Sequence, residues 1–322
     1  MTAQVQSQTH YDVIVVGSGA GAMTSAVFLA DHGFSVLIVE KSDKYGGTSA
    51  ISGGGIWIPN NHYFAKLNGN DTYATALRYL QAAAGEHVDE TRLRTYLDNA
   101  PKMIEELAQT SRVRYAVAAK YPDYYPHLPG ALPGGRTLDP EFFDTSLLGD
   151  ELDNLRKPSP STLLMGCIAW TARDAHKVMA RGFGWRLLIM GLMLRYKLDF
   201  KWRRKSKIDR RASLGSSLVA SLRRSLMDRN VPLWLNTDFA GLLPKDGRVS
   251  GVSVRRNGAE VQLHARHGVI LASGGFEQNQ ALREKYLPQP TRMAWSATPP
   301  GNNTGAALEA GLAQGAATAL MD

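Results

Sequence analysis

Two short apolar runs near the start of the chain enclose a glycine-rich turn. Val13 to Val16 form the first run, and Val36 to Val39 form the second, which ends in Glu40. The turn Gly17–Ala22 follows the first run and leads into a helix-like segment. Short apolar runs next to turn residues are typical of buried strands. The pattern therefore predicts a strand–helix–strand unit.

The middle of the chain carries two helix patterns and a long loop. Asp71 can cap the first helix, and the second is expected to start near Asp89. Pro101 would kink or restart that second helix. The stretch from Lys120 to Arg136 is dense in proline and glycine, so it is predicted to be loop.

Regular patterns return after residue 214. Ser216 or Ser217 can cap a helix, and residues 231–236 follow as a predicted strand. The runs 251–255 and 259–265 alternate across Asn257–Gly258, which favours a hairpin. A buried strand over residues 269–272 then leads into Ser273 and Gly274.

The first turn fits a dinucleotide fingerprint. Gly17 permits the tight turn, Gly19 lets the backbone approach a pyrophosphate, and Ala22 replaces the third glycine where helix meets strand. The helix N-terminus offers N–H groups to the phosphates, and Glu40 stands where an acid would accept ribose hydroxyls. The alternative is a tight turn without a ligand. Two further glycine clusters, Gly46–Gly47 and Gly53–Gly55, indicate backbone passing close to a flat ligand, with a flexible loop as the alternative for the second.

The run GGTSAISGGGIWIPNN resembles flavoprotein subunits of the fumarate reductase and succinate dehydrogenase superfamily, and is most similar to its 3-ketosteroid dehydrogenases. The resemblance implies FAD. Members of this superfamily with covalently linked flavin carry a histidine in this loop. No histidine lies between Glu40 and Pro59 here, so the resemblance implies that FAD binds non-covalently. The implied cofactor-binding residues are Gly17, Ser18, Gly19, Ala20, Gly21, Ala22, Glu40, Lys41, Gly46, Gly47, Thr48, Ser49, Gly53, Gly54, Ser273 and Gly274.

The resemblance also implies the fold class and the domains. We expect an α/β protein with a Rossmann-like FAD-binding domain of the two-dinucleotide-binding flavoprotein type over residues 1–277, including a small β-layer. Residues 278–322 would begin an inserted catalytic domain. Members of this family are markedly longer, so the chain is expected to be a fragment, a truncated product or half of a split pair.

In such dehydrogenases a proton leaves a carbon next to a ring ketone, and a hydride passes from the neighbouring carbon to flavin N5. The segment Pro122–Asp123–Tyr124 matches a family segment that carries a site tyrosine, so the resemblance implies a catalytic Tyr124. A phenol has a pKa near 10 and needs help to act as a base at neutral pH. Ser52 matches a substrate-pocket position. The alternatives are a packed or hydrogen-bonded loop tyrosine and a turn serine.

The expected partners are a lipophilic substrate, a steroid by the resemblance, and an external electron acceptor. Two other functions stay open: a fumarate-reductase-like enzyme acting on a dicarboxylate, and a non-catalytic flavin-binding fragment completed by a partner. Ala306 stands where relatives often carry aspartate, which weakens a close assignment of substrate.

Charge and cysteine content add two points. The net charge is +8, and residues 195–211 alone hold nine basic residues against two aspartates, directly after the apolar run 183–194. This segment suits a solvated basic loop beside a buried helix, an anionic membrane surface, or nucleic acid, for which no motif is present. We expect a cytoplasmic protein with peripheral contact at the inner membrane surface and no nucleic acid. The single cysteine, Cys167, excludes an intramolecular disulfide and is expected to be buried.

Overall fold

The computed structural model describes residues 9–321 of the chain, which form two compact units. The first unit runs up to Ser49 and also takes in Asp150–Arg156 and the chain from Leu222 onward. The second unit consists of Ala50–Gly149 and Lys157–Ser221. The proposed division into a domain over 1–277 and another from residue 278 stays a prediction.

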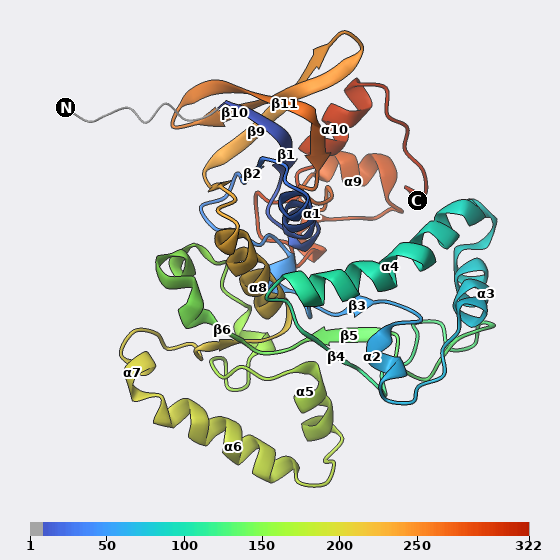
Figure 1. The fold of residues 1–322 in the computed structure, drawn as a ribbon, viewed down its shortest axis with the longest axis vertical. Coiled ribbons are helices and arrows are strands. Elements are labelled where there is room, and N and C mark those ends of the chain that lie inside the picture. The colour runs from blue at the N-terminus through green and yellow to red at the C-terminus, as the bar shows by residue number, and fades with distance from the viewer. Residues whose placement is uncertain (1–8, 322) are drawn as a thin grey trace. The chain divides into compact units, whose positions relative to one another are not determined.

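The first unit is built on a six-stranded sheet with the strand order β8-β2-β1-β11-β10-β9 (Figure 1). Strand β1 pairs in parallel with β2 and β11, β2 pairs in parallel with β8, and β10 is antiparallel to β9 and β11. The strands are β1 (His10–Val16), β2 (Val36–Val39), β8 (Leu233–Trp234), β9 (Thr237–Lys245), β10 (Arg248–Arg256) and β11 (Ala259–Leu271). The helices are α1 (Ala20–Asp31), α9 (Gln280–Tyr286) and α10 (Ala306–Ala313).

The core of this unit explains why the apolar runs become strands. Ile14 and Val16 of β1 pack with Leu37 and Val39 of β2 and with Leu263 of β11, and all five are nearly or fully buried. Parallel strands covered on both faces are expected to be continuously apolar. The predicted strand–helix–strand unit is therefore confirmed, and it brings the glycine turn to the carboxyl end of β1.

The hairpin between β10 and β11 is also confirmed. Asn257 and Gly258 have φ values of 51° and 79°, which a two-residue type I′ turn requires. The predicted strand over residues 269–272 is the end of β11, which pairs with β10 in its first half and with β1 in its second. One long strand thus joins the small β-layer to the parallel strands.

The second unit combines short sheets with helices. Its strands are β3 (Ile56–Trp57), β4 (Tyr115–Val117), β5 (Thr137–Pro140), β6 (Phe143–Asp144) and β7 (Arg211–Ala212). Its helices are α2 (His62–Ala65), α3 (Tyr73–Ala84), α4 (Glu90–Thr110), α5 (Ala172–Met179), α6 (Trp185–Leu198) and α7 (Phe200–Arg203). Helix α8 (Leu214–Asp228) has residues in both units. Across the two units, short 3₁₀ turns cover Ser49–Ile51, Gly85–His87, Thr145–Asn154, Pro160–Thr162 and Met293–Trp295.

Several predicted boundaries are wrong. Thr72, not Asp71, caps α3 by accepting a hydrogen bond from the backbone of Thr75, because the Asp71 carboxylate pairs with Arg136. Helix α4 continues through Pro101 without a break, while its predicted start at Asp89 is confirmed. Helix α8 begins before the predicted serine caps.

Two further expectations also differ from the structure. The strand predicted over residues 231–236 shortens to Leu233–Trp234. Cys167 is partly exposed rather than buried, because it lies in the turn between the bridged residues Leu164 and Ile168.

Candidate functional site

The glycine turn after β1 has the geometry that its sequence predicts. Gly17 has a φ of +104°, and a Cβ there would lie 2.5 Å from the carbonyl oxygen of Ala272, so only glycine fits. Gly19 is the N-cap of α1 and has no side chain to cap it. A Cβ on Gly19 would meet only the Ser49 hydroxyl, at 3.4 Å. The absence of a side chain at Gly19 therefore keeps space open rather than relieving a clash within the chain.

Glu40 stands at the end of β2 beside this turn. Its Oε2 accepts hydrogen bonds from the backbone N–H and the hydroxyl of Ser18, and its Oε1 accepts one from the Ser42 backbone. The Ser18 hydroxyl also accepts a hydrogen bond from the Gly46 backbone N–H at 3.0 Å. These bonds orient a carboxylate that is 8% exposed. Carboxylates can accept further hydrogen bonds, so Glu40 retains capacity for a ligand hydroxyl.

The glycine turn and Glu40 line a pocket of about 450 Å³ within the first unit. This volume lies in the usual range for small-molecule sites. The pocket holds most of the predicted cofactor residues, namely Gly17, Ser18, Gly19, Ala20, Gly21, Ala22, Glu40, Lys41, Gly47, Thr48, Ser49, Ser273 and Gly274. Gly46 is not among its lining residues, and its backbone N–H donates to the hydroxyl of Ser18, which is one of them.

Sequence reasoning missed part of this pocket. The additional lining residues are Val16, Val39, Thr237, Asp238, Phe239, Leu271, Ala272, Asn302, Asn303, Thr304 and Ala306. The signal that could have found some of them is the polar run Asn302–Thr304 after two prolines and a glycine. A Cβ on Gly274 would lie 2.5 Å from Oδ1 of Asn303, so the two turns approach each other closely at the pocket.

The pocket fits the phosphate and ribose portions of FAD. It offers the N-terminus of the twelve-residue helix α1 for phosphates, open space above Gly19 and an oriented acid for ribose hydroxyls. No histidine is among the described residues that line it. The residues that would hold FAD are therefore those of the glycine turn, Glu40 and the turn at Ser273–Gly274.

The second unit contains the remaining predicted residues. The Ser52 hydroxyl accepts a hydrogen bond from the Gly54 backbone at 3.0 Å, as a turn serine does, and the Ser52 carbonyl accepts one from Gly215. Gly54 has a φ of +70°, and a Cβ there would lie 2.6 Å from the backbone nitrogen of Gly215. The close approach at Gly54 is thus made by the chain itself, and a Cβ on Gly53 would meet nothing within 4 Å.

Tyr124 lies in the predicted loop, and its side chain is largely exposed, at 80%. It shares a side-chain hydrogen bond with Tyr121, and this bond raises the pKa of the Tyr121 phenol above its ordinary value of 10. The neighbouring Asp123 is buried. The loop therefore presents Tyr124 outward from a fixed neighbour.

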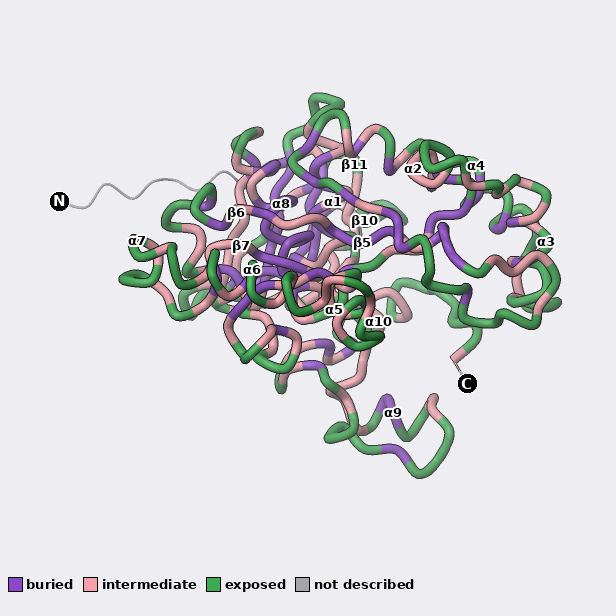
Figure 2. Tube along the Cα trace, turned by 90° about the horizontal axis from the view of Figure 1, so that it is seen from below, coloured by how far each residue is buried: buried purple, intermediate pink, exposed green. Residues whose placement is uncertain are grey.

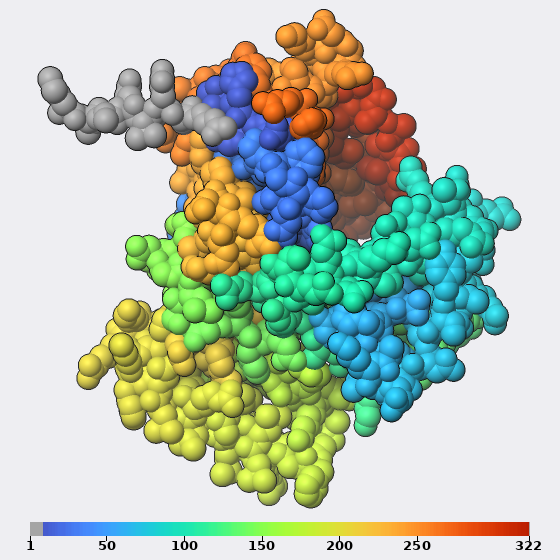
Figure 3. Space-filling model, in the orientation of Figure 1, coloured from blue at the N-terminus to red at the C-terminus, as the bar shows by residue number. Residues whose placement is uncertain are grey.

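Helix α6 of the second unit is not the buried helix that the solvated-loop alternative assumed. Leu192 is its only buried residue. Phe183 and four helix residues (Leu187, Met190, Leu194 and Leu198) expose large apolar side chains at intervals of three or four residues. The four helix positions with this spacing lie on one face of α6, and Phe183 lies just before the helix. In Figure 3, residues 183–203 lie at the surface of their unit, in yellow and yellow-green. Figure 2 shows that helix α7, which follows α6, is mainly exposed as well.

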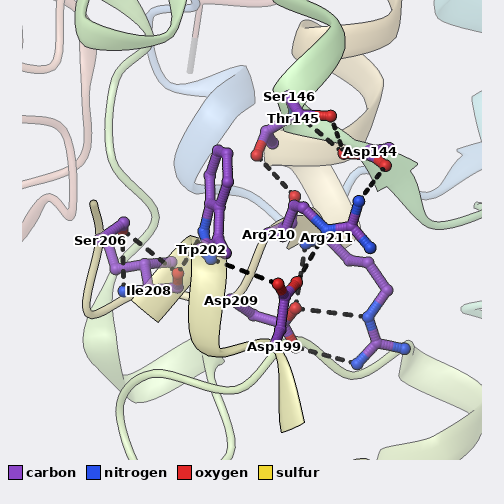
Figure 4. Close-up of polar contacts among 10 residues, drawn as sticks. All are labelled: Asp144, Thr145, Ser146, Asp199, Trp202, Ser206, Ile208, Asp209, Arg210 and Arg211. Atoms are coloured by element: carbon purple, nitrogen blue, oxygen red, sulfur yellow. Dashed lines mark hydrogen bonds and ion pairs between the residues drawn. The ribbon is translucent and has the colours of Figure 1, made fainter. Parts of the chain in front are cut away.

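Polar contacts fold the basic segment back onto its own unit (Figure 4). Arg210 bridges Asp144 and Asp199 at 3.0 and 2.8 Å, and Arg211 pairs with Asp209 at 2.9 Å. Trp202 donates its indole N–H to the carbonyl of Ile208. The remaining exposed basic residues have no ion pair within the described part of the chain; they include Arg195, Lys197, Lys201, Arg204, Lys205 and Lys207. None of the helices between residues 9 and 321 has the length and apolar character needed to cross a bilayer.

Comparison with known proteins places this chain among flavoproteins. The 3-oxosteroid 1-dehydrogenases of Comamonas testosteroni and Mycolicibacterium smegmatis are 41% and 38% identical to it, over 95% and 97% of the chain. The chain spans 54% and 55% of those proteins, about half their length.

A solved structure gives the same result. The 3-ketosteroid delta1-dehydrogenase of Sterolibacterium denitrificans, crystallised with 1,4-androstadiene-3,17-dione, matches with a TM-score of 0.94 and 52% identity. The match covers 98% of this chain and 56% of that protein. The resemblance inferred from the glycine clusters is thereby confirmed, and so is the Rossmann-like flavoprotein fold. Residues 12–322 match the model of the FAD binding domain family, and the chain belongs to that family.

Proposed function

We propose that the protein formed by this chain dehydrogenates a 3-oxosteroid, introducing a carbon–carbon double bond next to the ring ketone. The observation that carries the proposal is the similarity, over 98% of the chain, to an enzyme crystallised with a steroid dienone. When bound, FAD supplies the acceptor for the hydride that leaves the substrate. An external electron acceptor would then reoxidise the flavin.

Residues of this chain would bind FAD and accept the proton that leaves the substrate. The glycine turn, Glu40 and Ser273–Gly274 hold the cofactor. Loss of a proton next to the ketone needs a base at that carbon and a hydrogen-bond donor at the carbonyl oxygen. Tyr124 would hold or transfer a proton at its phenol oxygen, supported by its exposure and its bond to Tyr121. Ser52 stays a candidate for the substrate pocket.

Peripheral contact with an anionic membrane forms a second part of the proposal. The exposed apolar face of α6 and the unpaired basic residues that follow it are contiguous in the chain. An interfacial segment of this kind buries its apolar face among acyl chains, while its lysines and arginines meet anionic headgroups. A lipophilic substrate would be concentrated at the same surface. The positive charge of the segment favours an anionic membrane over an uncharged apolar surface.

The activity is tested with the full-length natural polypeptide, because the chain spans about half the length of its relatives. Purified protein is supplied with FAD, a panel of 3-oxosteroids and an artificial electron-accepting dye. We expect steroid-dependent dye reduction and formation of the conjugated double bond. Reduction of fumarate by a reduced dye, without any steroid turnover, would instead support the dicarboxylate alternative.

One variant and one treatment refine that test. Tyr124→Phe keeps the ring and removes the hydroxyl, so kcat should fall by about 10²- to 10⁴-fold at unchanged flavin content. An unaltered kcat would return Tyr124 to the role of a loop residue. Acid precipitation should leave the flavin in the supernatant, and yellow colour retained in the pellet would contradict non-covalent binding.

A further inference from the structure

The loop that carries Tyr124 ends on a buried ionic cluster in the second unit. The side chain of Arg136 is 1% exposed and donates from Nη1 to Oδ2 of Asp123 at 2.8 Å. Its Nε and Nη2 bind the two carboxylate oxygens of Asp71 at 3.0 and 2.8 Å. One guanidinium therefore faces two buried carboxylates and joins the loop to the segment before α3.

Asp123 is held from three directions. Its Oδ1 accepts the indole N–H of Trp57 at 2.7 Å, and its Oδ2 also accepts the Leu132 backbone N–H at 2.9 Å. The Asp123 backbone N–H donates in turn to the Leu132 carbonyl. Both carboxylate oxygens are thus satisfied, and the residue immediately before Tyr124 has a fixed backbone and side chain.

The residue after Tyr124 is anchored to the same cluster. The backbone N–H of Tyr125 donates to the hydroxyl of Tyr79 at 3.2 Å. The Arg136 guanidinium lies 5.5 Å from the ring centre of Tyr79 and 5.7 Å from that of Trp57, within cation–π range of both. The same cation therefore borders the anchor on each side of Tyr124.

We propose that Arg136 is a positioning residue that fixes Tyr124, through Asp123 on one side and Tyr79 on the other, for the proton step of the reaction. The inference rests on the proposed function, in which Tyr124 acts on the substrate. An arginine is required because its planar fork binds Asp71 with two donors and Asp123 with a third. A lysine keeps the charge but cannot make that pattern.

The test combines Arg136→Lys with Tyr124→Phe in the full-length polypeptide. We expect Arg136→Lys to lower kcat by about tenfold or more while changing the KM for the steroid little. In the Tyr124→Phe background the same change should lower kcat by less than about twofold, because residues that act as a unit are not additive. Arg173→Lys is the matched control, since Arg173 forms an exposed pair with Glu141 in the same unit.

A second readout does not depend on activity. Chymotrypsin cleaves after tyrosines that proline does not follow, so in this loop it can cut the bond between Tyr124 and Tyr125. Arg136→Lys should speed this cleavage by about tenfold, whereas Arg173→Lys should not. If Arg136→Lys fails to fold, Asp123→Asn serves instead, because it keeps the side-chain shape and weakens the ionic contact. It should show the same non-additivity with Tyr124→Phe.

The possible results separate the two proposals. A wild-type polypeptide without steroid turnover would overturn the proposed function. With turnover intact, an equal loss of kcat from Arg136→Lys in both backgrounds would overturn the positioning role. Unchanged chymotrypsin cleavage would overturn it as well.

Discussion

Ser18 donates two hydrogen bonds to one oxygen of Glu40, from its backbone N–H at 3.1 Å and from its hydroxyl at 2.5 Å. The contact joins the turn after β1 to the end of β2. Because the Ser18 hydroxyl also accepts from Gly46, it joins the following glycine cluster as well. The pair therefore orients the acid of the proposed cofactor pocket without help from a ligand, which would lower the ordering cost of binding.

Glu40→Gln should weaken FAD binding while leaving the fold intact. The substitution keeps the size of the side chain but removes the charge and one acceptor oxygen, and a hydrogen bond to a charged group contributes about 1.5–3 kcal/mol. We expect the Kd for FAD to rise by about 10- to 100-fold, measured by flavin fluorescence with apoprotein. Asp43→Asn is the control, because this nearby acid is exposed and its carboxylate contacts only its sequence neighbours Ser42 and Lys44 in the contacts described. Equal Kd values for FAD in the two variants would contradict the proposed role of Glu40 in binding the cofactor.

Gly17 and Gly19 should respond differently to valine. A Cβ on Gly17 meets backbone at 2.5 Å, so Gly17→Val should prevent folding. A Cβ on Gly19 is tolerated by the chain, so Gly19→Val should fold and lose FAD, because the side chain occupies space at the pocket. Circular dichroism and flavin content separate the two outcomes.

Gly241→Val, in β9 of the same unit, is the control for these substitutions. A Cβ at Gly241 meets nothing within 4 Å, and valine suits a strand. A Gly19→Val protein that keeps its flavin would contradict the role given to the open space above that residue.

The stability of the first unit should depend on alkaline pH through Tyr45. This side chain is fully buried, and its hydroxyl donates to the Glu151 carbonyl at 2.9 Å. Burial raises the pKa of the phenol well above its ordinary value of 10. The neutral phenol therefore contributes stability in full below about pH 10, and this contribution is lost as the pH rises toward the higher pKa of the folded state.

Tyr45→Phe should lower the free energy of unfolding by about 1–3 kcal/mol near neutral pH, because the Glu151 carbonyl loses its donor. The difference from the wild type should shrink above about pH 10, where ionisation of Tyr45 favours the unfolded wild-type chain. Urea denaturation at several pH values measures both effects. Tyr125→Phe is the control, since its side chain is exposed. A difference that stays constant up to pH 11 would count against the assigned pKa shift.

Local patterns predicted the elements whose causes are local. The glycine turn, β2 with Glu40 and the Asn257–Gly258 hairpin follow from residues adjacent in the chain, and the structure has all three. The parts missed depend on distant partners. Asp71 resembles a helix cap in sequence, but it pairs with Arg136, 65 residues away. Asn303 lines the pocket because its turn packs against Gly274, which no local pattern reveals.

Exposure is likewise a property that sequence alone left open. The apolar run before the basic segment was compatible with a buried helix, yet α6 buries only Leu192. Phe183, Leu187 and Leu194 are instead exposed, and exposed basic residues such as Lys201 and Lys205 follow them in the chain. Because α6 is exposed, the solvated loop beside a buried helix no longer explains the segment. We therefore predict that it contacts an anionic membrane.

The polypeptide should bind anionic vesicles and be released by salt. Each basic residue near an anionic surface contributes about 1 kcal/mol within a Debye length, so Lys201→Gln or Lys205→Gln should each lower partitioning by about fivefold. The paired change Leu187→Ser and Leu194→Ser should abolish binding by removing buried apolar area. Leu67→Ser with Leu147→Ser is the matched control, because these leucines are exposed elsewhere in the same unit.

Co-sedimentation with phosphatidylglycerol and with neutral phosphatidylcholine vesicles measures this binding. Equal recovery in both supernatants at low salt would reject the membrane, and self-association in equilibrium sedimentation, lost with the two serine substitutions, would assign the face to a second copy of the chain.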